Sequence, residues 1–272
     1  MSALGFVNMQ IAADLLLRPK TRVIATVRDP ASDTSRSLAT LPAADGSELV
    51  VFPVNDEVQG IGYKTIQERA EKAGINHLDV VVANAGASSG YDSVLATQGD
   101  AARACFEVNS IGPLKLFQAC WPLLEKRGPA EAVDKKFILM SSFIGSIQGL
   151  ETEDFPTAAY GMSKAAANWL AKKISVEFKE KGLAVAAIHP GWARTEMGQS
   201  FADALGVEQP PMTVEFSAAR VIEQVRAVEP ASVDVCGERA SEMDVLTSYK
   251  MDKLCLETTG NFVSFDGRPL AW

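Results

Sequence analysis

The chain has 272 residues, and its formal net charge is −8. This acidic balance argues against binding to nucleic acids or to anionic membranes, because both favour a basic protein surface. Hydrophobic residues make up 47% of the sequence, which is enough to fill the core of one large α/β domain. We therefore expect a single domain over residues 1–272.

The N-terminal residues do not have the pattern of a targeting segment. Residues 3–17 are fairly apolar, but Asn8, Gln10 and Asp14 interrupt them, and no basic region precedes them. No stretch of the sequence reaches the roughly 18 apolar residues that a membrane span needs. These features predict a cytoplasmic protein that does not enter membranes.

The sequence does not indicate a metal site. The cysteines are Cys105, Cys120, Cys236 and Cys255, and the histidines are His77 and His189. None of the cysteines has the Cys-x-x-Cys spacing that is typical of metal or redox sites. We expect free thiols in a reducing compartment.

Short apolar runs alternate with helical patterns along the chain. The expected strands are residues 21–27, 48–54, 78–83, 136–141, 183–189 and 261–265, and the expected helices are the first twenty residues, 57–73, 99–127, 157–181 and 213–228. Pro122 is expected to kink or interrupt the helix at 99–127. Apolar strands of this kind are typical of sheets covered on both faces, and the alternation predicts a parallel, doubly wound α/β fold.

The chemistry is concentrated between residues 142 and 164. Tyr160 and Lys164 are four residues apart in a predicted helix, so their side chains share one face. A phenol titrates at about pH 10, and an adjacent ammonium group is expected to lower this pKa, so that the tyrosine can act as a general acid or base. Ser142, at the end of the preceding strand, could polarise a carbonyl or alcohol. The spacing alone also fits an amphipathic helix with a half-buried tyrosine and a solvated lysine.

Further motifs occur around this pair. In chain order they are Asn84-Ala85-Gly86, Asn109, Ser142 with Gly145, Tyr160 with Lys164, and Pro190-Gly191 with Thr195. Over roughly residues 20 to 200 the chain thereby resembles the short-chain dehydrogenase/reductase family, and several details resemble its fungal carbonyl-reductase and ketoreductase branch. The resemblance implies a Rossmann-like fold, assembly into a homodimer or homotetramer, and a cofactor of NADP(H), with NAD(H) as the alternative.

The resemblance implies a role for each catalytic residue. Tyr160 would protonate the oxygen of a ketone or aldehyde, or deprotonate the alcohol in the reverse direction, and Ser142 would hydrogen-bond the same oxygen. Lys164 would lower the pKa of Tyr160 and bind the nicotinamide ribose, while Asn109 would hold open a helix and support a proton relay. Ser141 is the weaker candidate, because Ser142 has Gly145 at the family's interval.

The cofactor-binding residues are also implied by the resemblance. Arg28 would bind the adenosine 2′-phosphate, since a guanidinium group suits phosphate geometry, although an ordinary loop arginine is the alternative. Asn55 or Asp56 would approach the adenine. The remaining residues are Asn84, Ala85 and Gly86 at the adenine ribose, and Pro190, Gly191 and Thr195 over the nicotinamide, in addition to Tyr160 and Lys164. Residues 196–212, including Phe201, would cover the substrate, and the loop at 151–155 would extend the rim of the pocket.

The chain departs from the family pattern in two places. The strand at 21–27 resembles the family's second strand, so the usual first strand and its glycine-rich turn are missing; without gaps, two of the turn's glycines fall on Phe6 and Asn8. Residues 231–259 are expected to be an insertion, which forms a surface excursion, a substrate lid or an oligomer contact. Three explanations of the first departure stay open: an incomplete start, a truncated non-catalytic paralogue, or a cofactor-independent isomerase or cyclase using Ser142 and Tyr160.

Overall fold

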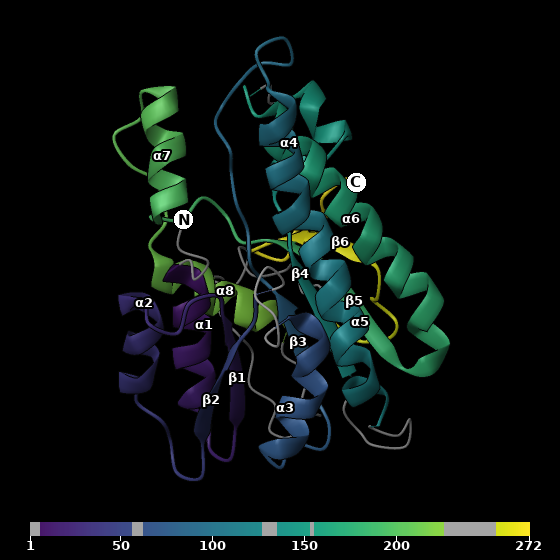
Figure 1. Cartoon of the computed structure of the whole chain (residues 1–272). Coiled ribbons are helices and arrows are strands. Elements are labelled where there is room, and N and C mark those ends of the chain that lie inside the picture. The colour runs from purple at the N-terminus through teal and green to yellow at the C-terminus, as the bar shows by residue number, and fades with distance from the viewer. Residues whose placement is uncertain (1–5, 56–61, 127–134, 153–154, 226–253) are drawn as a thin grey trace, which may run out of the picture.

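The computed structural model describes residues 6–55, 62–126, 135–152, 155–225 and 254–272. Helices and strands alternate along these residues (Figure 1). The helices are α1 (Phe6–Leu16), α2 (Asp33–Ser37), α3 (Ile66–Lys72), α4 (Gly99–Phe106), α5 (Gly112–Glu125), α6 (Ala158–Phe178), α7 (Glu196–Leu205) and α8 (Val214–Val225). The strands are β1 (Arg22–Val27), β2 (Glu48–Pro53), β3 (Val80–Ala83), β4 (Lys135–Met140), β5 (Leu183–His189) and β6 (Asn261–Ser264).

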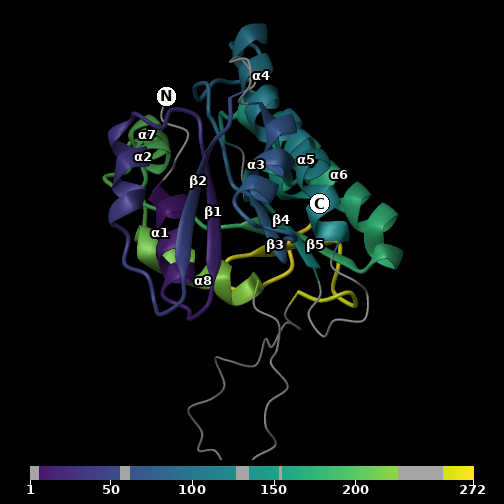
Figure 2. The same ribbon diagram turned by 60° about the horizontal axis from the view of Figure 1, so that its bottom comes forward.

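All strand pairs are parallel, as the sequence predicts, but the described strands form two sheets. One contains β1 and β2, and the other has the order β3-β4-β5-β6. Figure 2 shows β1 and β2 as a pair apart from β3, β4 and β5. The interruption between β1 and β3 agrees with the predicted loss of the family's first strand, because no strand of the described residues lies between them.

The four-stranded sheet is covered by helices on both faces. Phe137 and Leu139 of β4 belong to a core cluster with residues of α5 and α6, whereas Ile138 and Met140 belong to a second cluster with residues of α1 and α8. Figure 1 shows these two helix pairs on opposite sides of the strands. Because successive strand residues face opposite ways, this alternation buries all six residues of β4. The doubly wound architecture is therefore confirmed.

The helical stretch predicted at 99–127 has a different internal structure from the expected one. The chain continues through Pro122 inside α5 as far as Glu125, so an interruption at this proline is wrong. Leu123 and Leu124, directly after it, are fully buried, and this packing offsets the loss of one backbone hydrogen bond. The irregularity lies earlier, in a π-helical turn over Glu107–Ile111.

Two predicted segments lie partly outside the described residues. The helix expected at 57–73 is seen as α3, preceded by a 3₁₀ turn over Tyr63–Thr65, and residues 57–61 are not described. Of the expected insertion at 231–259, only residues 254–259 are described, and they form turns. Within the described parts of the chain, no helix combines the length and the apolar character that crossing a membrane requires.

Candidate active site

Ser142 and Tyr160 are brought together at the end of β4. Ser142 directly follows the strand and caps the 3₁₀ turn Phe143–Gly145, with its Oγ accepting a hydrogen bond from the Ile144 N–H at 3.3 Å. Tyr160 lies in the first turn of α6, and its side chain is hydrogen-bonded to that of Ser142. Ser141 instead donates a hydrogen bond to Asn168. The structure thus places Ser142, rather than Ser141, beside the tyrosine.

A close contact between the Ser142 turn and α6 makes this arrangement possible. A Cβ atom added to Gly145 would lie 2.7 Å from Cβ of Lys164 and 2.8 Å from its backbone carbonyl carbon. Only a residue without a side chain permits the turn to pack at this distance. Gly145 is therefore part of the geometry that holds Ser142 against α6.

Lys164 and Asn109 lie beside the same site and are both buried. The Lys164 Nζ donates a hydrogen bond to the Met140 carbonyl at 2.8 Å and lies 5.7 Å from the centre of the Tyr160 ring. Asn109 sits in the π-helical turn, where its Oδ1 accepts from the Ala87 N–H at 2.9 Å. Its Nδ2 donates to the Ala87 carbonyl at 2.9 Å and to Ser163 Oγ at 2.8 Å. Asn109 therefore joins the loop after β3 to α6.

The electrostatics of the pair differ from the sequence prediction. Burial raises the pKa of Tyr160 to about 12, whereas the hydrogen bond from Ser142 lowers it only in part. Tyr160 as a whole residue is only partly buried, but its hydroxyl is enclosed by protein. Burial also lowers the pKa of Lys164 to about 8. The net shift of the Tyr160 pKa is therefore opposite to the predicted lowering, because the cost of burying the phenolate is the largest effect.

Gly86, which was expected at the adenine ribose, lies beside Asn109 and Lys164, while Pro190, Gly191 and Thr195 were expected over the nicotinamide. A Cβ atom on Gly86 would stand 3.6 Å from Asn109 Oδ1 and 3.7 Å from Lys164 Nζ, so the glycine leaves a space beside both. Gly191 has a φ of +82°, and its missing side chain makes room for Met212. Thr195 uses its Oγ1 to cap α7, accepting from the Gly198 N–H at 3.0 Å. Pro190 contributes its carbonyl to a hydrogen bond from Ser217.

The other residues expected at the adenosine side follow β1, β2 and β3. Arg28 is exposed directly after β1, and Asn55 is partly buried shortly after β2, whereas Asp56 lies outside the described residues. Asn84 and Ala85 directly follow β3 and line a cavity between β1 and β3. None of Ser142, Tyr160, Lys164 and Asn109 lines that cavity.

The residues present fit a nicotinamide dinucleotide only in part. The space at Gly86, beside the Lys164 amine, suits a ribose and nicotinamide. A diphosphate is usually held by a glycine-rich turn before a helix, where backbone N–H groups are free to bind it. Before α1, the sequence has one glycine, Gly5, and residues 1–5 are not described. The described residues therefore offer a space beside the Lys164 amine and an exposed cation at Arg28, without a glycine-rich turn.

An aromatic cluster near the tyrosine contains residues that sequence reasoning missed. Phe201 of α7 is the centre of the cluster, with ring-centre distances of 5.0 Å to Tyr91, 5.4 Å to Phe155 and 5.3 Å to Trp192. The Tyr91 hydroxyl donates to the Met197 carbonyl at 3.1 Å. Tyr91 is also close enough to Tyr160 to raise its pKa. Phe201 and the loop at 151–155 were predicted at the pocket, but Tyr91 carries no local sequence signal.

His189, at the end of β5, makes the stability of the folded chain depend on pH. Its Nδ1 is buried and has no hydrogen-bond partner among the described residues, and burial lowers its pKa to about 4. Between this value and the ordinary pKa of about 6.5, the unfolded chain binds a proton that the folded chain does not. Acidification therefore favours unfolding.

We expect the free energy of unfolding to fall by about 2 kcal/mol between pH 7 and pH 5 because of His189 alone. Urea denaturation at both pH values should show that His189→Gln loses this part of the pH dependence. His77→Gln is the matched control, because His77 is half-exposed. Equal pH dependence in the wild type and in His189→Gln would contradict the prediction.

Comparisons with known proteins agree with this geometry. A family model described as enoyl-(acyl carrier protein) reductase matches residues 10–243. The norsolorinic acid ketoreductase nor1 of Dothistroma septosporum is 36% identical over 208 residues, which cover 76% of this chain and 75% of that protein. The chain belongs to the short-chain dehydrogenase/reductase family. It is accordingly an enzyme of the oxidoreductase class.

Other relatives and solved structures extend the comparison. This short-chain dehydrogenase/reductase is 32% identical over 211 residues to the norsolorinic acid ketoreductase of Aspergillus parasiticus, covering 77% of this chain and 75% of that protein. The NADPH-bound carbonyl reductase from chicken fatty liver has a TM-score of 0.75 at 24% identity, covering 98% of this chain and 94% of that one. The carbonyl reductase Sniffer of D. melanogaster has a TM-score of 0.73 at 23% identity, covering 98% and 95%. At these identities, the two structures support the fold.

The described residues hold no group of three or more histidine, cysteine, aspartate or glutamate side chains that could bind a metal ion. Three of the predicted free thiols are described, and all three are unpaired: Cys105 and Cys120 are buried, and Cys255 is partly exposed. Cys236 lies outside the described residues.

Proposed function

We propose that the chain is an NADP(H)-dependent reductase of a ketone or aldehyde, with Tyr160 as the general acid. The observation that carries this proposal is the hydrogen-bonded pair of Ser142 and Tyr160 next to the buried Lys164 amine. Three polar groups of this kind at one point supply a proton, a hydrogen bond and a positive charge, which is what a carbonyl oxygen needs while it gains negative charge.

The raised pKa of Tyr160 suits the reductive direction. With a pKa of about 12, the phenol is protonated at neutral pH and can donate its proton to the oxygen of the substrate. Ser142 would donate a hydrogen bond to the same oxygen. Lys164, with a pKa of about 8, is largely charged at neutral pH, and its charge favours the phenolate that proton donation leaves behind. Asn109 positions the loop of Gly86 and Ala87 beside this amine.

A bound nicotinamide dinucleotide would supply the hydride, and the protein residues would hold and orient it. Lys164, Gly86, Gly191 and Thr195 are proposed to bind its nicotinamide half. Arg28 is the proposed partner of an adenosine 2′-phosphate, which favours NADP(H) over NAD(H). Pro190, Asn55, Asn84 and Ala85 complete the proposed binding residues.

The aromatic cluster favours an aromatic carbonyl substrate. Tyr91, Phe155, Trp192 and Phe201 surround one side of the site with rings, and rings of this kind stack on planar ligands. The norsolorinic acid ketoreductases have a ketone-reducing activity in their names, and the two named above are 36% and 32% identical to this chain over the matched residues. We propose an aryl ketone as the substrate class.

Phe201→Ala is expected to raise KM for an aryl ketone about tenfold and to change kcat little, because the ring contributes binding rather than proton transfer. Steady-state kinetics with an aryl ketone and with a small aliphatic ketone separate the two effects. Phe216→Ala serves as the control, since Phe216 is an exposed phenylalanine of α8, outside the cluster. Equal effects of Phe201→Ala on both substrates would argue against an aromatic subsite.

The proposal is tested by titrating the purified protein with NADPH and by following NADPH oxidation with a panel of aryl ketones and aldehydes. Binding together with turnover supports the reductase. The absence of NADPH binding by a folded protein would overturn it and would favour a cofactor-independent isomerase, cyclase or non-catalytic paralogue. These alternatives to a reductase are kept because the described residues lack the glycine-rich turn.

A further inference from the structure

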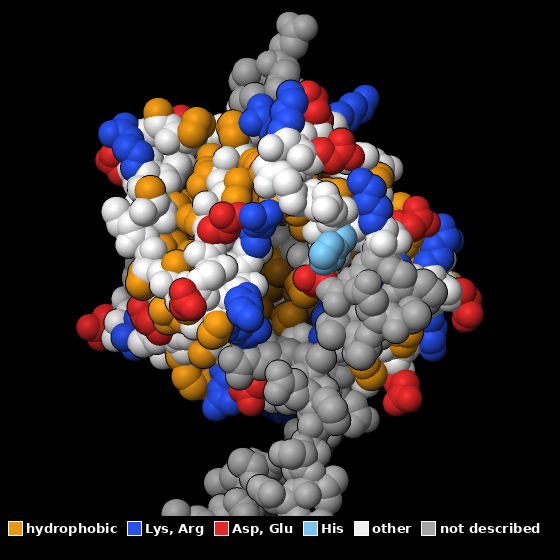
Figure 3. Space-filling view, turned by 90° about the horizontal axis from the view of Figure 1, so that it is seen from below, with side chains coloured by type: hydrophobic (Ala, Val, Ile, Leu, Met, Phe, Trp, Pro, Cys, Tyr) orange, Lys and Arg blue, Asp and Glu red, His pale blue; other side chains and the backbone are white. Residues whose placement is uncertain are grey.

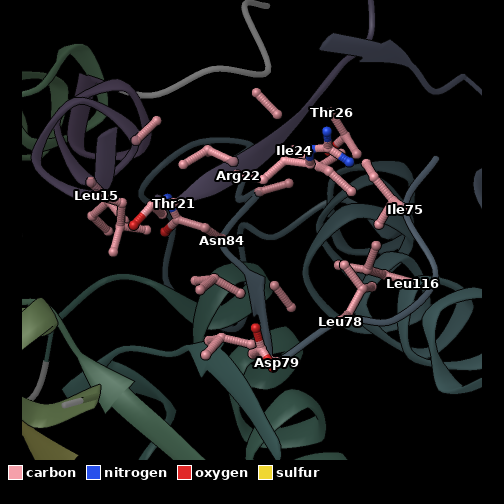
Figure 4. Close-up of a pocket in the computed structure, with 18 of the residues that line it drawn as sticks. Leu15, Thr21, Arg22, Ile24, Thr26, Ile75, Leu78, Asp79, Asn84 and Leu116 are labelled. Carbon is pink, nitrogen blue, oxygen red and sulfur yellow. The ribbon is translucent and has the colours of Figure 1, made fainter. Parts of the chain in front are cut away.

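The cavity between β1 and β3 does not reach the turn that carries Ser142. It has a volume of about 710 Å³, and Figure 4 shows Leu15 and Leu116 on opposite sides of it, with Asn84 between them. Seen from below, the molecular surface is hollowed, with hydrophobic side chains at the floor and charged side chains near the rim (Figure 3). Among the described residues, none after Leu116 lines this cavity. The contacts that hold Ser142 in place therefore come from other elements.

One support of this turn is α6. Gly145 packs without a side chain against Lys164, and the Asn168 Nδ2 donates a hydrogen bond to the Gly145 carbonyl at 3.2 Å. Ser146 ends the turn that Ser142 begins, and it is buried. The Gly145 N–H donates to the Ser142 carbonyl at 2.9 Å, which joins the two ends of the turn. A displacement of Ser146 is therefore transmitted to Ser142.

The second support is formed by residues 268–272, the Trp272 segment. The chain reverses direction after β6, and the segment runs antiparallel to that strand. The Ser264 N–H donates to the Arg268 carbonyl at 2.8 Å, and the Leu270 N–H donates to the Phe262 carbonyl at 2.8 Å. The segment is thereby anchored to the four-stranded sheet.

The Trp272 segment contacts the turn through Ser146. The Ser146 Oγ donates a hydrogen bond to the Ala271 carbonyl at 2.7 Å and accepts one from the Gly149 N–H at 2.9 Å. The Gln148 N–H also donates to the Trp272 carbonyl, at 3.4 Å. Because Ser146 is only 2% exposed, removal of its hydroxyl would deprive two backbone groups of this partner where water has little access.

The Trp272 ring fixes the segment to β6 and to α6. The ring stacks on Phe262 of β6, with ring centres 5.5 Å apart and an angle of 30° between the planes. The Lys172 Nζ lies 5.7 Å from the centre of the Trp272 ring and donates a hydrogen bond to the Gly260 carbonyl at 2.9 Å. Lys172 belongs to the helix that carries Tyr160, and Figure 1 shows this end of the chain beside that helix. The segment thus connects the two elements that carry the proposed catalytic group.

We propose that Trp272 and Ser146 are positioning residues, which hold Ser142 at the Tyr160 hydroxyl. The Trp272 ring fixes the segment against β6 and α6, and Ser146 connects the segment to the turn. Without these contacts the turn loses the second of its two supports, and Ser142 can move away from the substrate oxygen. This inference rests on the proposed reductase activity, in which Ser142 acts on the carbonyl oxygen.

Trp272→Ala is expected to lower kcat for an aryl ketone about tenfold and to change KM for NADPH less than about twofold, because a small displacement of a catalytic group affects the chemical step most. Trp272→Phe keeps a ring on Phe262 and should retain kcat within about threefold of the wild type. Trp169→Ala is the matched control, since Trp169 is 66% exposed on α6, and it should leave kcat unchanged. Steady-state kinetics give these values, and urea denaturation checks that the variants are folded.

A double-mutant cycle with Ser142→Ala separates positioning from a general loss of structure. In the Ser142→Ala background, Trp272→Ala should lower the residual kcat less than about twofold, because the group that it positions is already absent. Ser146→Ala should behave in the same way, and it replaces Trp272→Ala if that variant does not fold. An equal loss of kcat in both backgrounds would overturn the proposal.

Amide hydrogen exchange, measured by NMR, gives a readout that does not need turnover. In Trp272→Ala the Gly145 amide, which donates to the Ser142 carbonyl, should exchange about tenfold faster, whereas the Ile138 amide in the centre of β4 should change little. Unchanged exchange at Gly145 would overturn the proposal. Faster exchange in a protein that does not reduce ketones would support the positioning of Ser142 by this segment, and the reductase proposal alone would fail.

Discussion

Tyr160→Phe is expected to lower kcat for carbonyl reduction by about 10²–10⁴-fold, the range typical of a lost general acid. The substitution removes the hydroxyl that is hydrogen-bonded to Ser142 and keeps the ring beside the Lys164 ammonium group. The substrate oxygen then loses its proton donor at neutral pH, although the cavity for the ring is unchanged. Steady-state kinetics with NADPH and an aryl ketone give kcat directly.

Binding and stability measurements complete this test. NADPH affinity should change much less than kcat, and the free energy of unfolding should change by only about 1 kcal/mol, the usual value of one hydrogen bond. Tyr63→Phe is the matched control, because Tyr63 lies in the 3₁₀ turn before α3, outside the catalytic group. A kcat within a factor of two of the wild type would exclude Tyr160 as the proton donor.

Gly145→Ala is expected to reduce both activity and stability. The new Cβ would lie 2.7 Å from Cβ of Lys164 and 2.8 Å from its carbonyl carbon, so the turn that follows Ser142 must move away from α6. Overpacking of this kind costs about 1–3 kcal/mol of unfolding free energy. A displacement of about 1 Å between catalytic groups can reduce turnover about 10²-fold, and this loss should appear in kcat/KM.

The control for this substitution is Gly99→Ala at the beginning of α4, where the nearest heavy atom to a new Cβ is the Arg103 Nη1 at 3.7 Å. Urea denaturation and steady-state kinetics of the two variants separate a general effect of losing a glycine from the local contact. If Gly145→Ala were as stable and active as Gly99→Ala, the contact between the turn and α6 would not position Ser142.

The sequence predicts the central strands well, because burial on both faces leaves a continuous apolar signature. Residues 183–189 were predicted as a strand and form β5 with the same bounds. Strands at the interruption are less regular, and β3 is two residues shorter than its apolar run at 78–83. The interruption itself was predictable, since the pattern of the first twenty residues is helical.

The proximity of Tyr160 and Lys164 was predictable from their spacing, whereas the electrostatics of the proposed catalytic group were not. The distance of four residues from Tyr160 to Lys164 fixes their common helix face, but the degree of burial depends on the whole fold. That burial determines the direction of both pKa shifts. Tyr91 was missed for a related reason: its contact with Met197 joins residues 106 positions apart, a separation that carries no local pattern.

Because the strands form two separate sheets, the two parts are expected to unfold locally at different free energies. The buried residues of β1, Ala25 and Val27, belong to a small cluster with Leu38, and Phe52 is the one residue of β2 in a larger core, whereas β4 and β5 contribute residues to both larger cores. A pair of strands with so little apolar burial is marginal by itself. We expect the segment from β1 to β2 to open at a lower free energy than the rest and to be the first site of proteolytic cleavage during native-state opening.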